Sequence, residues 1–297
     1  MRRSLAVCIV LLVPFGFLLA DSSAFTTQAD TLHDQGKFAE AKNFLLDAAK
    51  SAASGKEKAE LFWRAARETL EIGDLAEKAK QPTADILKIF VEGEGYADKA
   101  IEADPQNDLG IYWKSSNIGR WGQVKGILDS LFKAGPMRDL LFKVLALNPD
   151  RSDAYYVLGQ LYRELPGWPL SFGNIDQAVS LGRKAVDLRT EQFQAGAEKD
   201  LVFNFYTELA KTLYKRNWSA ASRAGEQKNK ASRYAAAKTP FEKASAYEAA
   251  VTLKDLSDRD EAKDLAQWTI SQLEKLPSLT AGQSKDLQKA KDALKGW

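Results

Sequence analysis

The sequence predicts an all-α fold, organised as an α-solenoid of five to six stacked helical hairpins. From Phe25 onward, apolar residues recur at helical spacing almost everywhere, and long alternating or β-branched runs are missing. Related units also follow one another at a period of about 34 residues. No unit is large enough to bury its own apolar face, so neighbouring units are expected to stack and complete the core.

The best-formed unit covers residues 147–190. Its two helices carry aromatic, aliphatic and small residues at the positions where they would touch: Tyr155, Leu158, Gly159, Tyr162, Ala178 and Ala185. Gly159 costs about 1 kcal/mol relative to alanine in a helix, unless a second backbone passes close to it. These six positions resemble those of one tetratricopeptide (TPR) repeat, and the resemblance implies a TPR-like solenoid.

The other units are less regular, and several turns are expected inside them. They cover residues 29–53, 57–105, 108–149 and 201–238, then a last pair of helices at 247–256 and 259–276 and a capping helix within 277–297. Gly73-Asp74 marks a turn in the second unit, and Pro136 is expected to open a helix in the third. Gly93 and Gly95 indicate a helix end or a loop.

Residues 1–24 are predicted to be a signal peptide, which leaves 25–297 as the repeat domain. Arg2-Arg3 forms a basic start, residues 5–20 are apolar, and Ser22-Ser23-Ala24 offers a cleavage site before Phe25. An uncleaved membrane anchor is the alternative. The apolar run is short for a span of about 17–25 residues and is interrupted by Pro14 and Gly16, which favours cleavage.

The single cysteine supports export without disulfide bonds. Cys8 lies early in the apolar run, so the segment before it is too short for a lipoprotein signal, and the mature chain would contain no thiol. Export of a chain without disulfides fits a bacterial periplasm best, so a periplasmic or secreted location is expected. The formal net charge of +2 gives no general argument for nucleic acid or an anionic membrane as a partner.

Catalytic chemistry is not expected. His33 is the only histidine, which removes Ser-His-Asp and Cys-His machinery and any zinc site with histidine or cysteine ligands in the mature chain. Acidic pairs such as Glu92 and Glu94 fit solvated helix faces, and no glycine-rich phosphate loop is present. The sequence therefore predicts a protein that is not an enzyme and has no cofactor or metal.

Residues 108–190 carry a second resemblance. In order, they contain W-K-S-S-N-I-G-R-W-G, a helix ending L-A-L-N-P, the stretch Y-Y-V-L-G-Q-L-Y-R-E-L-P, and then G-N-I-D-Q-A after an interruption at 166–173. This order resembles the T-component of tripartite (TRAP) periplasmic transporters, a TPR-like family. The resemblance implies an exported helical protein that works beside a solute-binding protein, although this chain lacks the lipobox cysteine of anchored members.

Two sets of residues are candidates for binding. Asp153, Tyr156, Gln160 and Arg163 lie off the packing stripe, on the helix face that a TPR stack turns toward its concave side. Trp113, Trp121 and Trp168 could line an apolar cleft, although core packing is the favoured interpretation for these tryptophans. A polar groove at the first set would favour a scaffold that binds a partner protein or peptide. A tryptophan-lined cleft would favour a transport accessory that holds a small solute.

Overall fold

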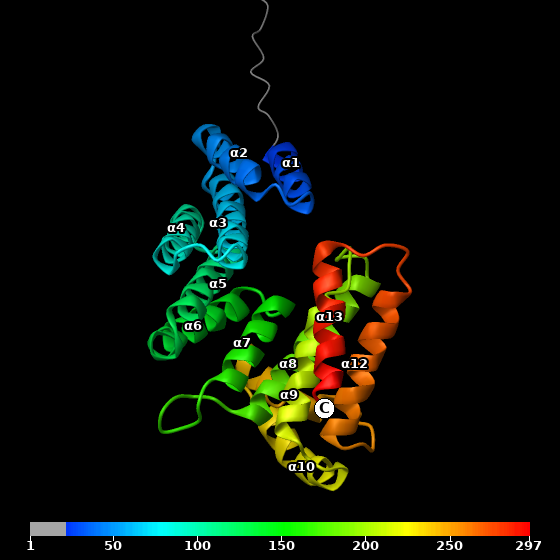
Figure 1. The fold of residues 1–297 in the computed structure, drawn as a ribbon. Coiled ribbons are helices and arrows are strands. Elements are labelled where there is room, and N and C mark those ends of the chain that lie inside the picture. Colours follow the sequence, from blue (N-terminus) through cyan, green and yellow to red (C-terminus); the bar gives the residue numbers. More distant parts are fainter. Residues whose placement is uncertain (1–21) are drawn as a thin grey trace, which may run out of the picture.

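The computed structural model of the chain describes residues 22–297, and every regular element in that range is helical (Figure 1). In chain order these are α1 (Ser22–Asp34), α2 (Phe38–Ser51), α3 (Gly55–Lys78), α4 (Thr83–Ala103), α5 (Asp108–Lys125), α6 (Ile127–Leu147), α7 (Ser152–Glu164), α8 (Ile175–Gln194), α9 (Phe203–Arg216), α10 (Ala220–Ala236), α11 (Pro240–Ser245), the 3-10 turn η1 (Tyr247–Ala250), α12 (Asp258–Glu274) and α13 (Ala281–Lys295). The predicted all-α fold is confirmed.

Most of the predicted signal peptide lies outside the described residues. Its last three residues, Ser22-Ser23-Ala24, form the start of α1. Within the described range, no helix combines the length and the apolar character that crossing a membrane requires.

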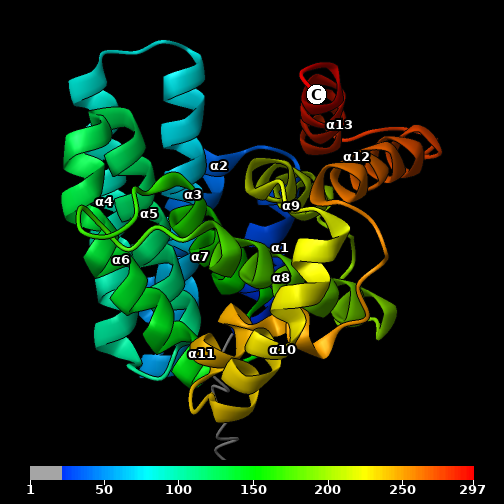
Figure 2. The same cartoon turned by 90° about the horizontal axis from the view of Figure 1, so that it is seen from below.

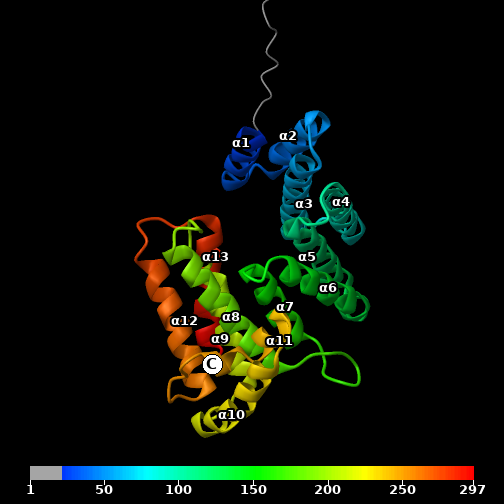
Figure 3. The same ribbon diagram turned by 180° about the vertical axis from the view of Figure 1, so that it is seen from behind.

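Successive helices pack as hairpins, which confirms the predicted solenoid. The first four hairpins are α1–α2, α3–α4, α5–α6 and α7–α8. The fifth departs from the prediction, because α9 packs on α12 and not on α10. The segment between them, α10 through η1, is an insertion that lies over α8. Figures 1 and 3 show the stack curving into a U, with α1–α3 on one arm, α12–α13 on the other and α7 between them.

The fourth hairpin has the packing that its sequence predicts. Tyr155, Leu158, Tyr162, Ala178 and Ala185 are all buried in the largest apolar cluster of the molecule. A β-carbon placed on the glycine of the stripe, Gly159, would lie 3.4 Å from the Ala178 carbonyl oxygen and 3.4 Å from the Gly182 nitrogen. The backbones of α7 and α8 therefore approach closely at this glycine.

The predicted turn at Gly73-Asp74 is wrong, because α3 continues through both residues to Lys78. Gly73 instead provides a notch for an aromatic ring of α4. A β-carbon on Gly73 would lie 2.4 Å from Cε1 of Phe90, which is fully buried. The turn lies a few residues later and includes Lys80, whose φ is +57°. This glycine thus serves interhelical packing and not chain reversal.

The prediction that Pro136 opens a helix is also wrong. The break between the helices of this unit lies at Gly126, whose φ of +124° ends α5, and α6 then runs through Pro136. Proline removes one helical N–H donor. Pro136 is exposed, as is Phe132 one turn earlier, so water can replace the lost donor.

A buried charge network fastens the insertion to the repeats. It joins α8, α9, α10, η1 and α12 through four cations and four carboxylates: Arg183, Arg216, Arg223, Lys230, Asp176, Glu248, Asp258 and Glu261. Arg216 is at its centre, with Nη1 2.6 Å from Glu248 Oε2 and Nε 2.8 Å from Asp258 Oδ2. Charges buried in this way are tolerated because each is paired and hydrogen-bonded.

The network also explains why residues 247–256 do not form the predicted helix. They contain the short turn η1 and then irregular chain up to α12. Within η1, Glu248 is almost completely buried between the three cations Arg183, Arg216 and Lys230. Burial alone would raise the pKa of the Glu248 carboxyl, but hydrogen bonds to Arg216 and the surrounding positive charges hold it far below its usual range. The predicted capping helix at the C-terminal end is confirmed as α13.

Replacing Gly93 with alanine is expected to lower the free energy of unfolding by about 1–3 kcal/mol, because the site has no room for a methyl group. Gly93 lies inside α4, where a helix end or a loop was predicted, and its β-carbon would lie 2.1 Å from Oδ1 of the buried Asn117. The Asn117 side-chain amide donates a 3.2 Å hydrogen bond to the Ala66 carbonyl oxygen, so moving Asn117 would disturb the contact between α5 and α3.

Gly95 is the matched control in the same helix, because a β-carbon there meets no atom within 4 Å. Gly95→Ala is expected to raise the free energy of unfolding by about 0.5–1 kcal/mol through the backbone alone. Urea unfolding followed by circular dichroism compares the two variants. Equal effects would contradict the packing role of Gly93.

Candidate partner-binding groove

An apolar groove lies between the third and fourth hairpins. It has a volume of about 600 Å³ and is formed by the second half of α5, the first half of α6 and α7. Its apolar walls are made by Ile118, Leu131, Met137, Val157, Leu161 and Leu165. A concave, mainly apolar surface with a few polar groups is the usual form of a binding site.

Small residues on α5 create this groove. Gly119, Gly122 and Gly126 all line it and recur every three or four residues, which places them on one side of the helix. Gly119 also lets α6 approach, since a β-carbon there would lie 2.6 Å from Cε of Met137. The glycines therefore leave a hollow where larger side chains would fill the space between α5 and α7.

Large apolar side chains are exposed on the two segments that border the groove. Phe132 is 84% exposed and stands between the lining residues Leu131 and Lys133. Trp168 and Leu170 are 89% and 80% exposed and follow the lining residue Pro166. Single exposed apolar residues are common, but three large ones on the two segments that also line an apolar groove indicate a contact surface.

Two of the four residues predicted on the face of α7 line the groove. Gln160 and Arg163 do so, whereas Asp153 is half-buried and lies outside the lining. Tyr156 lies behind it, with its hydroxyl accepting a 2.7 Å hydrogen bond from the Gln160 amide and its ring stacked 4.3 Å from that of Phe205 on α9. Burial, and then the charge of Glu208, raises the pKa of the Tyr156 hydroxyl well above its usual range.

The charge of Arg163 is largely satisfied within the protein. Its guanidinium donates to the side chain and carbonyl oxygen of Glu208, at 2.7 and 3.1 Å, and to Oε1 of Glu164 at 2.6 Å. Tyr156 and Arg163 thus pack against α9, so these residues do not form an exposed polar groove, and the surface open to a partner is the apolar groove. The sequence could not anticipate this, because Glu208 is 45 residues away from Arg163.

The three tryptophans do not share a cleft. Trp113 and Trp121 pack against the apolar cluster that contains Leu70, Ile86 and Phe90, so core packing is confirmed for these two. The core-packing prediction is wrong for Trp168, which is exposed. Trp168 belongs to the connection between α7 and α8, which projects from the stack in Figure 1. The Gly173 N–H donates a 2.9 Å hydrogen bond to the Pro166 carbonyl oxygen, and this bond closes the base of the loop. Phe172 folds back onto Tyr162 of α7, with ring centroids 5.1 Å apart, whereas Trp168 and Leu170 stay exposed.

The apolar walls of the groove were not predicted. Val157 and Leu161 are spaced i, i+4 on α7 and form a second apolar face opposite the packing stripe, a signal that was available. The spacing of Gly119, Gly122 and Gly126 was also visible in the sequence. Phe132 gave no signal, since an exposed and a buried phenylalanine look alike in sequence.

The fold defines a helical-repeat protein, and comparisons with known proteins place its N-terminal half near one family. A model of the family "Regulator of microtubule dynamics protein 1-3" matches residues 25–167, just under half of the chain. The chain is also similar to "Regulator of microtubule dynamics protein 1" of Bos taurus, with 25% identity over 132 residues, and of Mus musculus, with 26% identity over 133 residues. Each alignment covers 44% of this chain, and the chain spans 39% and 41% of the length of these two curated relatives.

Among solved structures, "MamA RS-1 ArsTM double mutant" matches 66% of this chain and 84% of that chain, with 18% sequence identity and a TM-score of 0.37.

The part shared with the regulator family contains the whole groove. All lining residues fall between Ile118 and Pro166, inside the matched range 25–167. The whole buried charge network, the insertion α10–η1 and the C-terminal helices fall beyond it. The groove therefore lies wholly within the matched range of this chain.

Proposed function

We propose that this protein is an exported, non-catalytic helical-repeat scaffold, periplasmic or secreted, that binds a partner protein. The binding surface is the groove of α5, α6 and α7, which includes Gln160 and Arg163 of the predicted concave face. The single observation that carries this proposal is the 600 Å³ apolar groove bordered by exposed Phe132, Trp168 and Leu170. Its location within the family match supports the assignment.

The groove suits an apolar peptide segment with an acidic residue beside it. Its walls are mostly aliphatic, which favours aliphatic or aromatic side chains from the partner. Lys133 lines the groove and makes no ion pair in the described part of the chain, and its ammonium group lies 5.3 Å from the ring centroid of Trp121. A carboxylate on the partner would complement this charge at the rim.

Removing the exposed aromatics at the rim is expected to weaken peptide binding at least tenfold. Peptides are first selected on the immobilised full chain from a random library, and their Kd values are then measured by fluorescence polarisation. The test variant is Phe132→Ser with Trp168→Ser. The loss is expected because aromatic anchors supply much of the binding free energy at such surfaces.

The control for this prediction is Leu75→Ser with Val91→Ser, which removes two exposed apolar residues from α3 and α4. It is expected to bind the selected peptides as the unmodified chain does. Equal binding by both double variants, or selected peptides without apolar residues, would reject the groove as the site.

The name of the matched relatives suggests microtubules as a second candidate partner. The support is that the matched residues 25–167 include the entire groove. Pelleting of the chain with stabilised microtubules tests this candidate, with the rim variant as the comparison. Pelleting that the rim variant abolishes supports it, and a chain that stays in the supernatant rejects it.

A transport accessory of the TRAP T-component type is the alternative that the order of residues 108–190 favours. In that role the apolar groove would hold a small solute beside a solute-binding protein. A pull-down from the periplasmic fraction distinguishes the roles. Recovery of a solute-binding protein supports transport, and its reproducible absence rejects it.

A further inference from the structure

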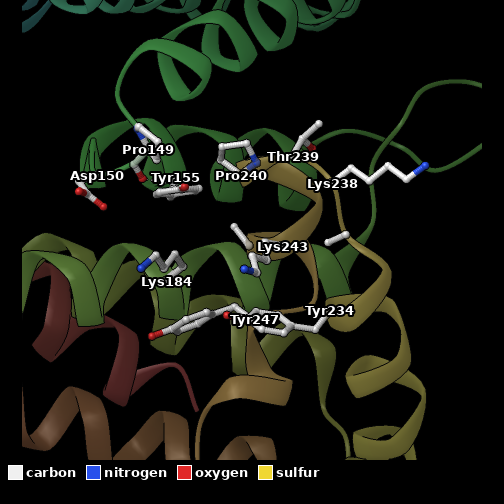
Figure 4. Close-up of a pocket in the computed structure, with 12 residues that line it drawn as sticks. Pro149, Asp150, Tyr155, Lys184, Tyr234, Lys238, Thr239, Pro240, Lys243 and Tyr247 are labelled. Atoms are coloured by element: carbon white, nitrogen blue, oxygen red, sulfur yellow. Dashed lines mark hydrogen bonds between the residues drawn. The ribbon is translucent and has the colours of Figure 1, made fainter.

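A second pocket lies between the fourth hairpin and the insertion (Figure 4). Its volume is about 350 Å³, within the range of about 300–1,000 Å³ that is usual for small-molecule sites. It shares no lining residue with the α5–α7 groove, and most of its wall comes from α8 and from residues 234–247. It is therefore a separate site, and the inference goes beyond the proposed function.

Two lysine ammonium groups and three tyrosine rings meet in this pocket. Figure 4 shows Lys184 and Lys243 between Tyr155 on one side and Tyr234 and Tyr247 on the other. The Lys184 ammonium lies 5.2 Å from the ring centroid of Tyr247, and that of Lys243 lies 5.5 Å from the ring centroid of Tyr234. A third lysine of the lining, Lys238, points away from the pocket.

The positive charge of the pocket is only partly balanced by carboxylates of the protein. Within the residues that the structure describes, neither Lys184 nor Lys243 has a carboxylate within ion-pair distance. Asp150 is the one carboxylate among the lining residues. Asp187 lies outside the lining, shares a hydrogen bond with the Tyr247 hydroxyl and interacts electrostatically with Lys184. Because neither lysine is held in an ion pair within the described residues, both ammonium groups can contact an anionic ligand.

The walls are held in place by contacts behind the pocket. Lys184 follows Arg183, and Tyr247 precedes Glu248. Nε of Arg183 lies 2.7 Å from Oε1 of Glu248, so the buried charge network holds both walls together. On the opposite wall, the Tyr155 hydroxyl donates a 2.9 Å hydrogen bond to the Pro149 carbonyl oxygen, and this bond holds the tyrosine ring in place. Because these walls are already ordered, less conformational entropy is lost when a ligand binds.

We propose that this pocket binds a small organic anion. A carboxylate or phosphate group would lie between the ammonium groups of Lys184 and Lys243, and a flat or apolar body would lie against the tyrosine rings. The same chemistry is presented by a free small molecule and by a phosphorylated side chain of a partner, and the probes below separate these two sources.

Isothermal titration calorimetry of the full chain tests the proposal with four probes: inorganic phosphate, succinate, phenyl phosphate and a hexapeptide with one phosphotyrosine. Saturable one-to-one binding is expected, with phenyl phosphate at least threefold tighter than inorganic phosphate because of the tyrosine rings. A peptide that binds more tightly than phenyl phosphate would assign the site to a partner's side chain. A peptide that binds no more tightly would assign it to a free anion.

Replacing both lysines, as Lys184→Ala with Lys243→Ala, is expected to weaken binding at least tenfold. The control is Lys228→Ala with Lys254→Ala, which removes the same charge from exposed positions outside the pocket and is expected to bind as the unmodified chain does. Circular dichroism confirms that each variant is folded. The proposal is overturned if no probe binds saturably, or if both double variants weaken binding equally.

Discussion

Replacing Arg216 with methionine is expected to lower the free energy of unfolding by about 3–5 kcal/mol, because the change leaves buried carboxylates without a partner. Arg216 has a fully buried side chain and bonds to Asp176, Glu248 and Asp258. Methionine fills much of the same volume but cannot compensate the three negative charges. The expected result is a lower urea midpoint in an unfolding curve followed by circular dichroism.

The matched control is Lys50→Met, which breaks an exposed pair with Asp47 on α2. Its side chain is 77% exposed, and exposed pairs contribute little to stability, so the midpoint is expected to stay unchanged. The same small effect from both variants would show that the buried charge network does not stabilise the fold. It would also remove the argument that the network holds the walls of the anion pocket.

Replacing Phe90 with alanine is expected to lower the free energy of unfolding by about 3–5 kcal/mol, the usual effect of removing a buried aromatic ring. Phe90 is completely buried, and its ring occupies the notch that Gly73 leaves on α3. Because α3 and α4 meet at this ring, alanine would leave a cavity that neither helix can close by a small shift. Chemical unfolding followed by circular dichroism measures the change.

Val91→Ala is the control, since Val91 is the next residue of the same helix and is 55% exposed. It is expected to change the free energy of unfolding by less than about 0.5 kcal/mol, as surface substitutions usually do. If Phe90→Ala proved as mild, the cluster around Leu70, Ile86 and Phe90 would not be a structural core.

The fold was predictable wherever a local pattern matched a local contact. The stripe of Tyr155, Leu158 and Tyr162 identified one face of α7, because helical periodicity alone decides which residues share a face. Gly73 and Pro136 misled for the opposite reason. Glycine and proline usually mark helix ends or turns in a sequence. In α3, however, Gly73 accommodates a ring from a neighbouring helix, and in α6 Pro136 lies where water can replace its missing donor.

The candidate site was predictable only in part. Gln160 and Arg163 were identified as residues off the packing stripe, and both line the groove. Their neighbours across the groove come from α5 and α6, and the partners that satisfy Arg163 come mainly from α9. The spacing of residues along α7 cannot predict contacts with segments that are distant in sequence.

By itself, the sequence determined the helical class, the location of the best hairpin and the stacking of hairpins, since these depend on periodicity and on small residues at helix contacts. Only the tertiary structure decided that α9 pairs with α12 and that the intervening segment is an insertion. The physical reason is that the insertion is held by charges such as Arg216 and Glu248, 32 residues apart. In sequence such residues look like solvated surface, and they become a buried network only when the chain brings them together.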